Sequence, residues 1–88
     1  MAEADAILDA RGWTCPLPVL QARRLLGLAE PGEVLVVEAT DPLSVRDFRD
    51  WAAADRSVEL VEQHERDDEG RRLFVHRLRK RENSGERA

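Results

Sequence analysis

The feature that most constrains this fold is an alternation of strand-like and helix-like apolar segments along the chain. Residues 6–10 and 34–39 are short apolar runs, and the second, Val34-Leu35-Val36-Val37-Glu38-Ala39, is rich in β-branched residues, as buried strands are. Between them, apolar residues recur at helical spacing from Pro16, and Pro31-Gly32 must end that helix. A second helical segment begins after Asp41-Pro42.

Two further strands are predicted in the last third of the chain. Residues 57–64 and 73–78 have strand character, and the acidic stretch Asp67-Asp68-Glu69-Gly70 between them has the composition of a turn. The order is therefore β-α-β-α-β-β. Right-handed crossovers put both helices on one side of the sheet, and a short turn makes the last two strands antiparallel. We predict an α/β two-layer sandwich, with a mixed four-stranded sheet and two helices on one face.

The predicted core joins the second helix to the sheet. Its aromatic residues Phe48 and Trp51, three positions apart, share one helix face with Leu43. The residues expected to meet this face from the sheet and from the first helix are Val34, Val36, Leu60, Phe74, Leu20 and Leu26.

Length and charge limit what the chain can be. Its 88 residues allow one domain. We expect that domain at residues 6–80, between a disordered N-terminus (1–5) and a disordered C-terminal tail (81–88) that lacks apolar residues apart from the last alanine. No apolar run is long enough to cross a membrane, and the acidic start does not resemble a secretory signal, so we expect a cytoplasmic protein. A net charge of −4 disfavours direct nucleic-acid binding.

Cys15 is the strongest candidate for chemistry. It is the only cysteine, and it directly precedes a predicted helix, whose N-terminal partial positive charge favours a thiolate. The Leu17 N–H and the Arg11 side chain are candidate partners for that thiolate. The alternative is that Cys15 is a small packing residue.

The remaining titratable residues are predicted to have structural roles. His64 and His76 are expected to be half-buried strand residues, and Asp41 and Asp47 to serve in helix capping and surface charge. No ligand spacing predicts a metal site.

The segment Leu8-Asp9-Ala10-Arg11-Gly12-Trp13-Thr14-Cys15-Pro16-Leu17-Pro18 resembles the signature of the TusA (SirA/YhhP-like) sulfur-carrier family: Asp-x-x-Gly, two residues, then Cys-Pro-x-Pro. Pro31-Gly32-Glu33-Val34-Leu35, Asp41-Pro42, Arg46-Asp47-Phe48 and Arg79-Lys80 are similar to later family segments. The resemblance covers about residues 7–80 and implies the same β-α-β-α-β-β fold.

The resemblance implies a sulfur relay. Cys15 would carry sulfur as a covalent persulfide, with no other cofactor. It would take the sulfur from a cysteine desulfurase or a rhodanese-type donor and pass it to an acceptor protein. The outlets in the family are tRNA thiolation, cofactor biosynthesis and sulfur oxidation. Such a protein is a stoichiometric carrier with sulfurtransferase-type chemistry, and whether it also acts as an independent turnover enzyme stays open.

Other positions inherit supporting roles from the resemblance. Pro16 and Pro18 would shape the site, and Asp9 and Gly12 would support the preceding loop. The candidate contacts to the thiolate or to a partner are Arg11, Arg23, Arg24 and Arg46.

The sequence departs from the family in three places. Arginine stands at 23 and 24, where a lysine is frequent, and the second cysteine found after helix two in many members is absent. Asp55-Arg56-Ser57 replaces the Gly-His or Gly-Asn often seen just before the third strand. The altered segment puts the identity of the docking partner in doubt. We expect a monomer. The alternative function is a non-catalytic regulatory or interaction module with the same fold, in which Cys15 is not used.

Overall fold

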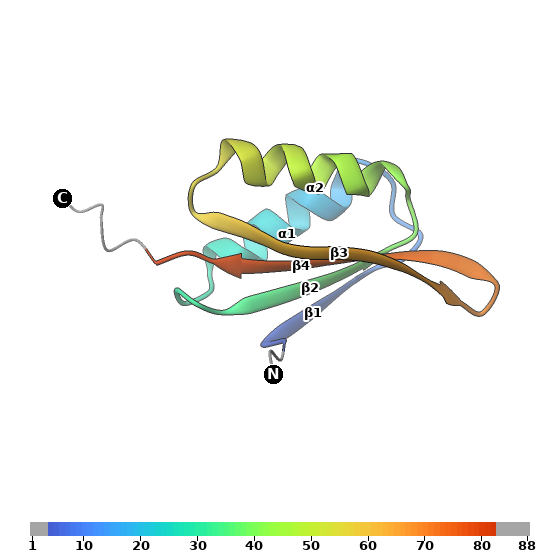
Figure 1. Ribbon diagram of the computed structural model, residues 1–88, viewed down its shortest axis with the longest axis horizontal. Helices are drawn as coiled ribbons and strands as arrows, with labels where there is room; N and C mark the ends of the chain where they lie inside the picture. Colours follow the sequence, from blue (N-terminus) through green and yellow to red (C-terminus); the bar gives the residue numbers. More distant parts are fainter. Residues whose placement is uncertain (1–3, 83–88) are drawn as a thin grey trace.

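A computed structural model describes residues 4–82 and has the predicted architecture. The elements are β1 (Ala6–Ala10), α1 (Leu17–Gly27), β2 (Val34–Ala39), α2 (Leu43–Ala54), β3 (Val58–Asp68) and β4 (Arg71–Lys80). The strands form one sheet in the order β1-β2-β4-β3. Both helices cover the same face of the sheet (Figure 1), so the two-layer α/β sandwich is confirmed.

The pairing of the strands decides where the loops meet. β1 and β2 are parallel neighbours with Ala10 opposite Ala39, and β4 is antiparallel to both β2 and β3. The carboxyl ends of β1 and β2 therefore lie side by side, and each leads directly into a helix. This edge brings the loop that precedes α1, with Cys15, next to the start of α2.

β2 has buried apolar side chains on both faces of the sheet, and their alternation differs from the predicted core. Leu35 and Val37 belong to the cluster formed with the helices, which contains the fully buried Phe48. Val36 is buried on the opposite face with Leu73 and Val75. The prediction that Val36 and Val34 meet Phe48 is wrong, because neighbouring strand residues point to opposite faces and the register places the odd-numbered residues beneath the helices.

The helices also differ from the predicted core. Leu20 and Leu43 are 48% and 49% exposed. The buried stripe of α1 is Pro18, Val19, Ala22 and Leu26, and that of α2 contains Ser44 and Phe48. Leu43 is one residue, about 100° of helical rotation, away from Ser44 and so turns outward. Leu26 is buried as predicted, and Trp51 and Leu60 are partly buried against the main cluster.

The hairpin β3–β4 is longer than predicted. β3 extends four residues beyond His64, and the turn itself comprises Glu69 and Gly70, both with positive φ. Antiparallel pairing is made by backbone groups and continues through polar residues, which is why the apolar pattern underestimates it. Ion pairs such as Arg72–Glu65, at 2.6 Å, join the two strands. In Figure 1 the hairpin projects at the edge where the helices begin.

The residues that directly flank the predicted domain are hydrogen-bonded to it. Asp5 exchanges two hydrogen bonds with the Val34 backbone, and the Arg81 N–H donates to the Ser57 carbonyl. Of the two segments predicted to be disordered, residues 1–3 and 83–88 lie outside the described residues.

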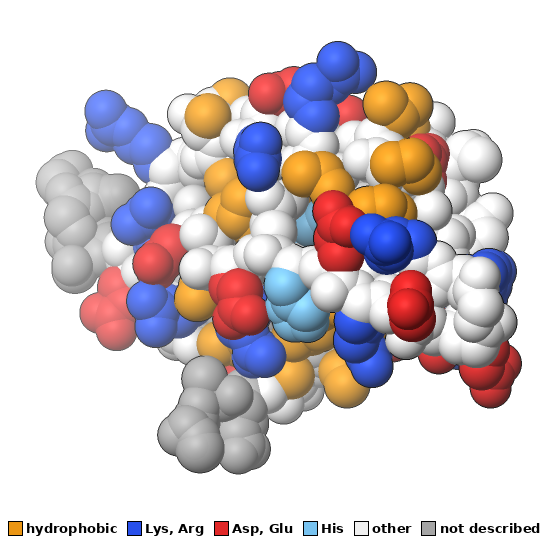
Figure 2. Space-filling view, turned by 45° about the vertical axis from the view of Figure 1, so that its right-hand side comes forward, with side chains coloured by type: hydrophobic (Ala, Val, Ile, Leu, Met, Phe, Trp, Pro, Cys, Tyr) orange, Lys and Arg blue, Asp and Glu red, His pale blue; other side chains and the backbone are white. Residues whose placement is uncertain are grey.

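The described helices are all too short and too polar to cross a membrane. Acidic and basic side chains interleave over the side of the molecule seen in Figure 2. That side therefore has no large patch of like-charged side chains. The net charge of the whole chain is −4.

Candidate functional site

Cys15 lies in the loop between β1 and α1, at the carboxyl edge of the parallel strands. Gly12 turns the chain away from β1 with φ +85°, a conformation that favours glycine. Its N–H donates to Thr40 Oγ1 at 2.9 Å, which ties the loop to the segment after β2. Cys15 is half-buried and belongs to neither hydrophobic cluster. This placement favours a presented thiol over a packing residue.

The Asp41 carboxylate joins the cysteine loop to α2. One oxygen accepts the Cys15 N–H at 2.7 Å, and the other accepts the N–H of Leu43, the first residue of α2, at 3.0 Å. The N-cap of α2 is Pro42, so the prediction that Asp41 caps this helix is wrong by one residue, although its side chain accepts the first helical N–H. The bond from the Cys15 N–H holds the backbone of Cys15 itself.

Asp47, in the first half of α2, is the carboxylate with the largest influence on the Cys15 thiol. Together with burial and the charge of Asp41, it raises the pKa of the thiol. Arg46 acts in the opposite direction. The Asp47 Oδ2 atom is buried without a hydrogen-bond partner. Asp47, expected to serve in helix capping and surface charge, thus has one carboxylate oxygen inside the molecule.

The expected stabilisation of a thiolate by the helix N-terminus is also wrong. α1 begins at Leu17, and Pro16 precedes the helix as its N-cap, not as its first residue. The Leu17 N–H, expected to face the sulfur, instead donates to the Thr14 carbonyl at 2.9 Å. Pro18 is buried in the first turn. The pKa of the Cys15 thiol is raised instead, with the Asp47 carboxylate, burial and the charge of Asp41 as the causes.

Among the four arginines predicted to contact the thiolate or a partner, Arg46 alone influences Cys15. Arg11 turns to the hairpin side, where it pairs with Asp9 at 2.8 Å and Asp68 at 3.1 Å. Its hydrogen bonds lower the pKa of the exposed Asp9 to about 2. Asp9 and Arg11 thus fasten the loop to the hairpin.

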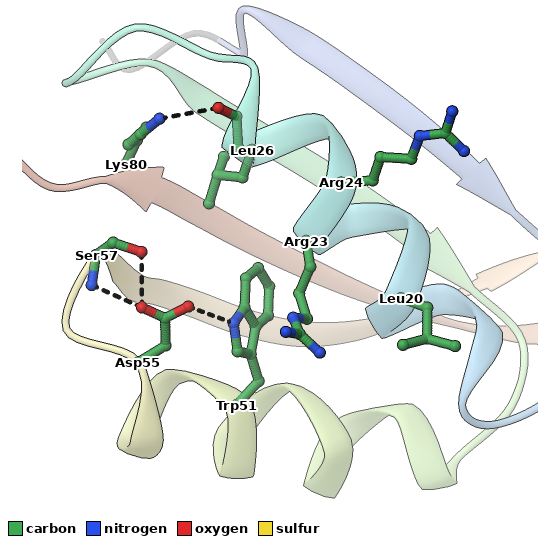
Figure 3. Close-up of a pocket in the computed structure, with 9 residues that line it drawn as sticks. Leu20, Arg23, Arg24, Leu26, Trp51, Asp55, Ser57 and Lys80 are labelled. Carbon is green, nitrogen blue, oxygen red and sulfur yellow. Dashed lines mark hydrogen bonds between the residues drawn. The ribbon is translucent and has the colours of Figure 1, made fainter.

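Arg23 and Arg24 lie in the second half of α1, roughly 12 Å along the helix from Cys15. They line an open groove of about 540 Å³ with Trp51 and Asp55 (Figure 3). Trp51 Nε1 donates to Asp55 there, and Lys80 Nζ donates to the Ala29 carbonyl at 2.9 Å beyond the end of α1. The structure separates these two arginines from the thiol.

His76 is fully buried, more than predicted, and is fixed as a neutral ring. Gln63 Oε1 accepts from Arg49, so its amide nitrogen faces Val45 O and His76 Nδ1 at 3.0 and 3.1 Å. Nδ1 must accept that bond, which leaves Nε2–H to donate to Ser44 Oγ at 2.9 Å. Burial lowers the pKa of His76 to about 4.

With both nitrogens used, His76 is a structural residue of the core. His64 is exposed and pairs with Glu62. Within residues 4–82, no three His, Cys, Asp or Glu side chains are grouped so as to hold a metal ion.

Sequence reasoning missed Asp41 and Asp47 as neighbours of the thiol. The signal that could have found them is topological. Parallel β1 and β2 bring the segments that follow them together, and Asp41 and Asp47 stand at the start of the second of these segments.

Comparisons with known proteins show the family of the chain. The family model described as sulfurtransferase TusA matches residues 6–77, nearly the whole described chain. The chain belongs to the TusA family. It is 49% identical over 65 residues to the sulfur carrier protein TusA of Allochromatium vinosum, covering 74% of this chain and 84% of that protein.

Two further relatives extend the comparison. A putative sulfur carrier protein of Halobacterium salinarum is 40% identical over 73 residues, covering 83% of this chain and 85% of that one. The crystal structure of a SirA-like protein from Desulfitobacterium hafniense superposes with a TM-score of 0.64 at 23% identity, over 88% of this chain and 99% of that chain. This last likeness shows the shared fold.

Proposed function

We propose that this TusA-family chain is a sulfur carrier that holds sulfane sulfur as a persulfide on Cys15. The observation that carries the proposal is the placement of the sole cysteine. Cys15 is half-buried in a loop anchored from two sides, outside both hydrophobic clusters. The family model described as sulfurtransferase TusA matches residues 6–77, which include Cys15, and relatives named sulfur carrier proteins are 49% and 40% identical to this chain.

The transfer step needs only a donor persulfide. Cys15 Sγ attacks the terminal sulfur of the donor's Cys–S–SH group, the S–S bond of the donor breaks, and the donor cysteine leaves as a thiol. The proton of Cys15 compensates the leaving thiolate, so no oxidant or reductant is consumed. In the second transfer, the thiol of an acceptor cysteine attacks the terminal sulfur of the Cys15 persulfide, and Cys15 leaves as a thiol. A cysteine desulfurase or a rhodanese-type protein fits the donor role.

The surroundings of Cys15 suit contact with another protein. Leu17 and Leu43, the first residues of the two helices, are 39% and 49% exposed, and Pro16 and Pro42 beside them are exposed. An apolar rim around a thiol provides contact area for a docking partner. Arg46, also exposed, adds one positive charge to this rim.

The test is to incubate the carrier with a cysteine desulfurase and cysteine and to record its intact mass. We expect a gain of one sulfur atom in the wild type and no gain in Cys15→Ser. No gain with a desulfurase or with a rhodanese-type donor would contradict the proposal and favour the interaction module. A gain in Cys15→Ser would show that the sulfur is held elsewhere.

A further inference from the structure

The buried polar side chains of the described chain form a single pair. Within residues 4–82, these side chains are Ser44 and His76, whose exposed fractions are 1% and 0%. Ser44 lies in the first turn of α2 and His76 on β4, and they are hydrogen-bonded to each other at 2.9 Å. A hydrogen bond inside an apolar cluster has a direction, which apolar contacts lack. The pair therefore fixes how α2 begins above the sheet.

Gln63 on β3 adds a second bond to the same helix turn. Its amide nitrogen donates to the Val45 carbonyl at 3.0 Å and to His76 Nδ1 at 3.1 Å. Its amide oxygen accepts from Arg49 of α2 at 3.1 Å, which sets the orientation of the amide. The β3–β4 hairpin thus holds the start of α2 through two side chains, one from each strand.

The first turn of α2 in turn holds Cys15. The Ser44 N–H donates to the Asp41 backbone carbonyl at 2.9 Å. The Asp41 carboxylate accepts the N–H groups of Leu43 and Cys15, at 3.0 and 2.7 Å. Pro42, the N-cap of α2, makes no side-chain capping bond. A continuous series of hydrogen bonds therefore leads from the core of the hairpin, through the start of α2, to the backbone of Cys15.

We propose that His76 and Gln63 are positioning residues, which place the Cys15 loop for sulfur transfer by holding the first turn of α2. This inference deepens the proposed sulfur-carrier function and rests on it for the transfer step. Neither residue touches the sulfur, and both act through Asp41, whose carboxylate holds the Cys15 backbone. Attack on a donor S–S bond needs an aligned sulfur, and a misplacement of about 1 Å can slow a reaction about a hundredfold.

The decisive variant is Ser44→Ala, which removes the hydroxyl that His76 binds and keeps every backbone group. Nuclear magnetic resonance records the backbone amide of Cys15, and intact mass records the rate of loading by a cysteine desulfurase with cysteine. We expect the Cys15 amide resonance to move, its hydrogen exchange to accelerate, and loading to slow about tenfold. The loss should appear in the kcat of loading and not in its KM, because the exposed rim that meets the donor is unchanged.

Ser57→Ala is the matched control. Ser57 Oγ donates to Asp55 Oδ1 at 2.6 Å, beyond the other end of α2, so the same atom is lost far from Cys15. Its Cys15 amide and its loading rate should equal those of the wild type. If Ser44→Ala lowers the free energy of unfolding but leaves the Cys15 amide and the loading rate unchanged, Ser44 is merely structural and the proposal is overturned. Movement of the amide without slower loading, or equal effects in the two variants, also overturns it.

Gln63→Met keeps the proposal testable if Ser44→Ala does not fold. Gln63 is half-buried, and methionine has a similar length but lacks the amide that binds Val45 and His76. We expect the same changes at Cys15 with a smaller size, and an unchanged Cys15 amide overturns the proposal. The amide measurements use no sulfur donor. A wild type that fails to load would therefore refute the proposed function, whereas variants that load as fast as a functional wild type would refute this inference alone.

Discussion

Two polar clusters lie along α2, within one turn of each other, and they are built in opposite ways. Around His76, every polar atom of the ring is used, the ring is stacked on Phe48, and the group is closed to solvent. Around Cys15, the residue is half-buried and Asp47 Oδ2 has no hydrogen-bond partner. The cluster whose ring nitrogens are both hydrogen-bonded contributes to stability. The cluster with an unbonded oxygen contains the candidate reactive sulfur. The comparison predicts that the two clusters respond differently to substitution.

The largest effect is expected from Phe48→Ala, which removes the aromatic ring on which His76 stacks. Phe48 is fully buried, and its ring lies 4.5 Å from His76, centroid to centroid. Truncating such a residue costs about 3–5 kcal/mol, a large part of the stability of a small domain. Urea unfolding measures the loss, with Leu43→Ala on the same helix as the exposed control. Equal losses in the two variants would show that our assignment of the buried face is wrong.

The next effect is a loss of stability in acid caused by His76. Its pKa is about 4 in the folded protein and 6.5 in a solvated histidine. As the pH falls from about 6.5 to about 4, the unfolded chain binds a proton that the folded chain refuses, so the stability present above pH 6.5 decreases by about 3 kcal/mol. Urea midpoints measured across this range should fall more steeply in the wild type and in His64→Gln than in His76→Gln. Identical slopes for all three would contradict the buried neutral ring.

A smaller effect is expected where the Cys15 loop joins the fold. Asp41→Ala removes the acceptor of two backbone N–H groups, those of Cys15 and Leu43. Loss of a side-chain acceptor at a helix start costs about 1 kcal/mol. Thermal unfolding is compared with that of the exposed Asp50→Ala, which should stay close to the wild type. A destabilisation as large as that of Phe48→Ala would mean that this end of the molecule belongs to the core.

The smallest effect on stability is expected from Cys15→Ser. The side chain packs in neither hydrophobic cluster, so the free energy of unfolding should stay within about 0.5 kcal/mol of the wild type. Urea unfolding of the two proteins side by side measures it. A loss comparable to that of Phe48→Ala would make the thiol a packing residue and remove the contrast between the two clusters.

The fold could be predicted because local and global patterns agree. The bounds of β1 and β2 follow from their apolar runs, and the order β-α-β-α-β-β admits few arrangements. Which face of β2 meets the helices could not be predicted, because Val36 and Val37 are both apolar and both buried. The full length of the hairpin was also missed, since its backbone pairing continues through polar residues.

For the candidate site, the sequence singles out one residue, and its role stays a prediction. Cys15 stands out by its uniqueness and by the motif around it. Its electrostatic environment depends on Asp41 and Asp47, which are 26 and 32 positions away in the sequence and reach it only through the pairing of β1 with β2. Sequence proximity suggested the helix end and Arg11 as its partners, and the tertiary structure replaces both with carboxylates.

The most direct test of a carrier is whether the sulfur leaves again. Wild-type protein is loaded, separated from the donor and its cysteine, and mixed with an acceptor protein that has one reactive cysteine, while the intact masses of both proteins are followed. The account predicts that this chain returns to its unloaded mass as the acceptor gains one sulfur atom, and that it can then be loaded again. Sulfur that stays on Cys15, or that is released without appearing on the acceptor, would contradict the account.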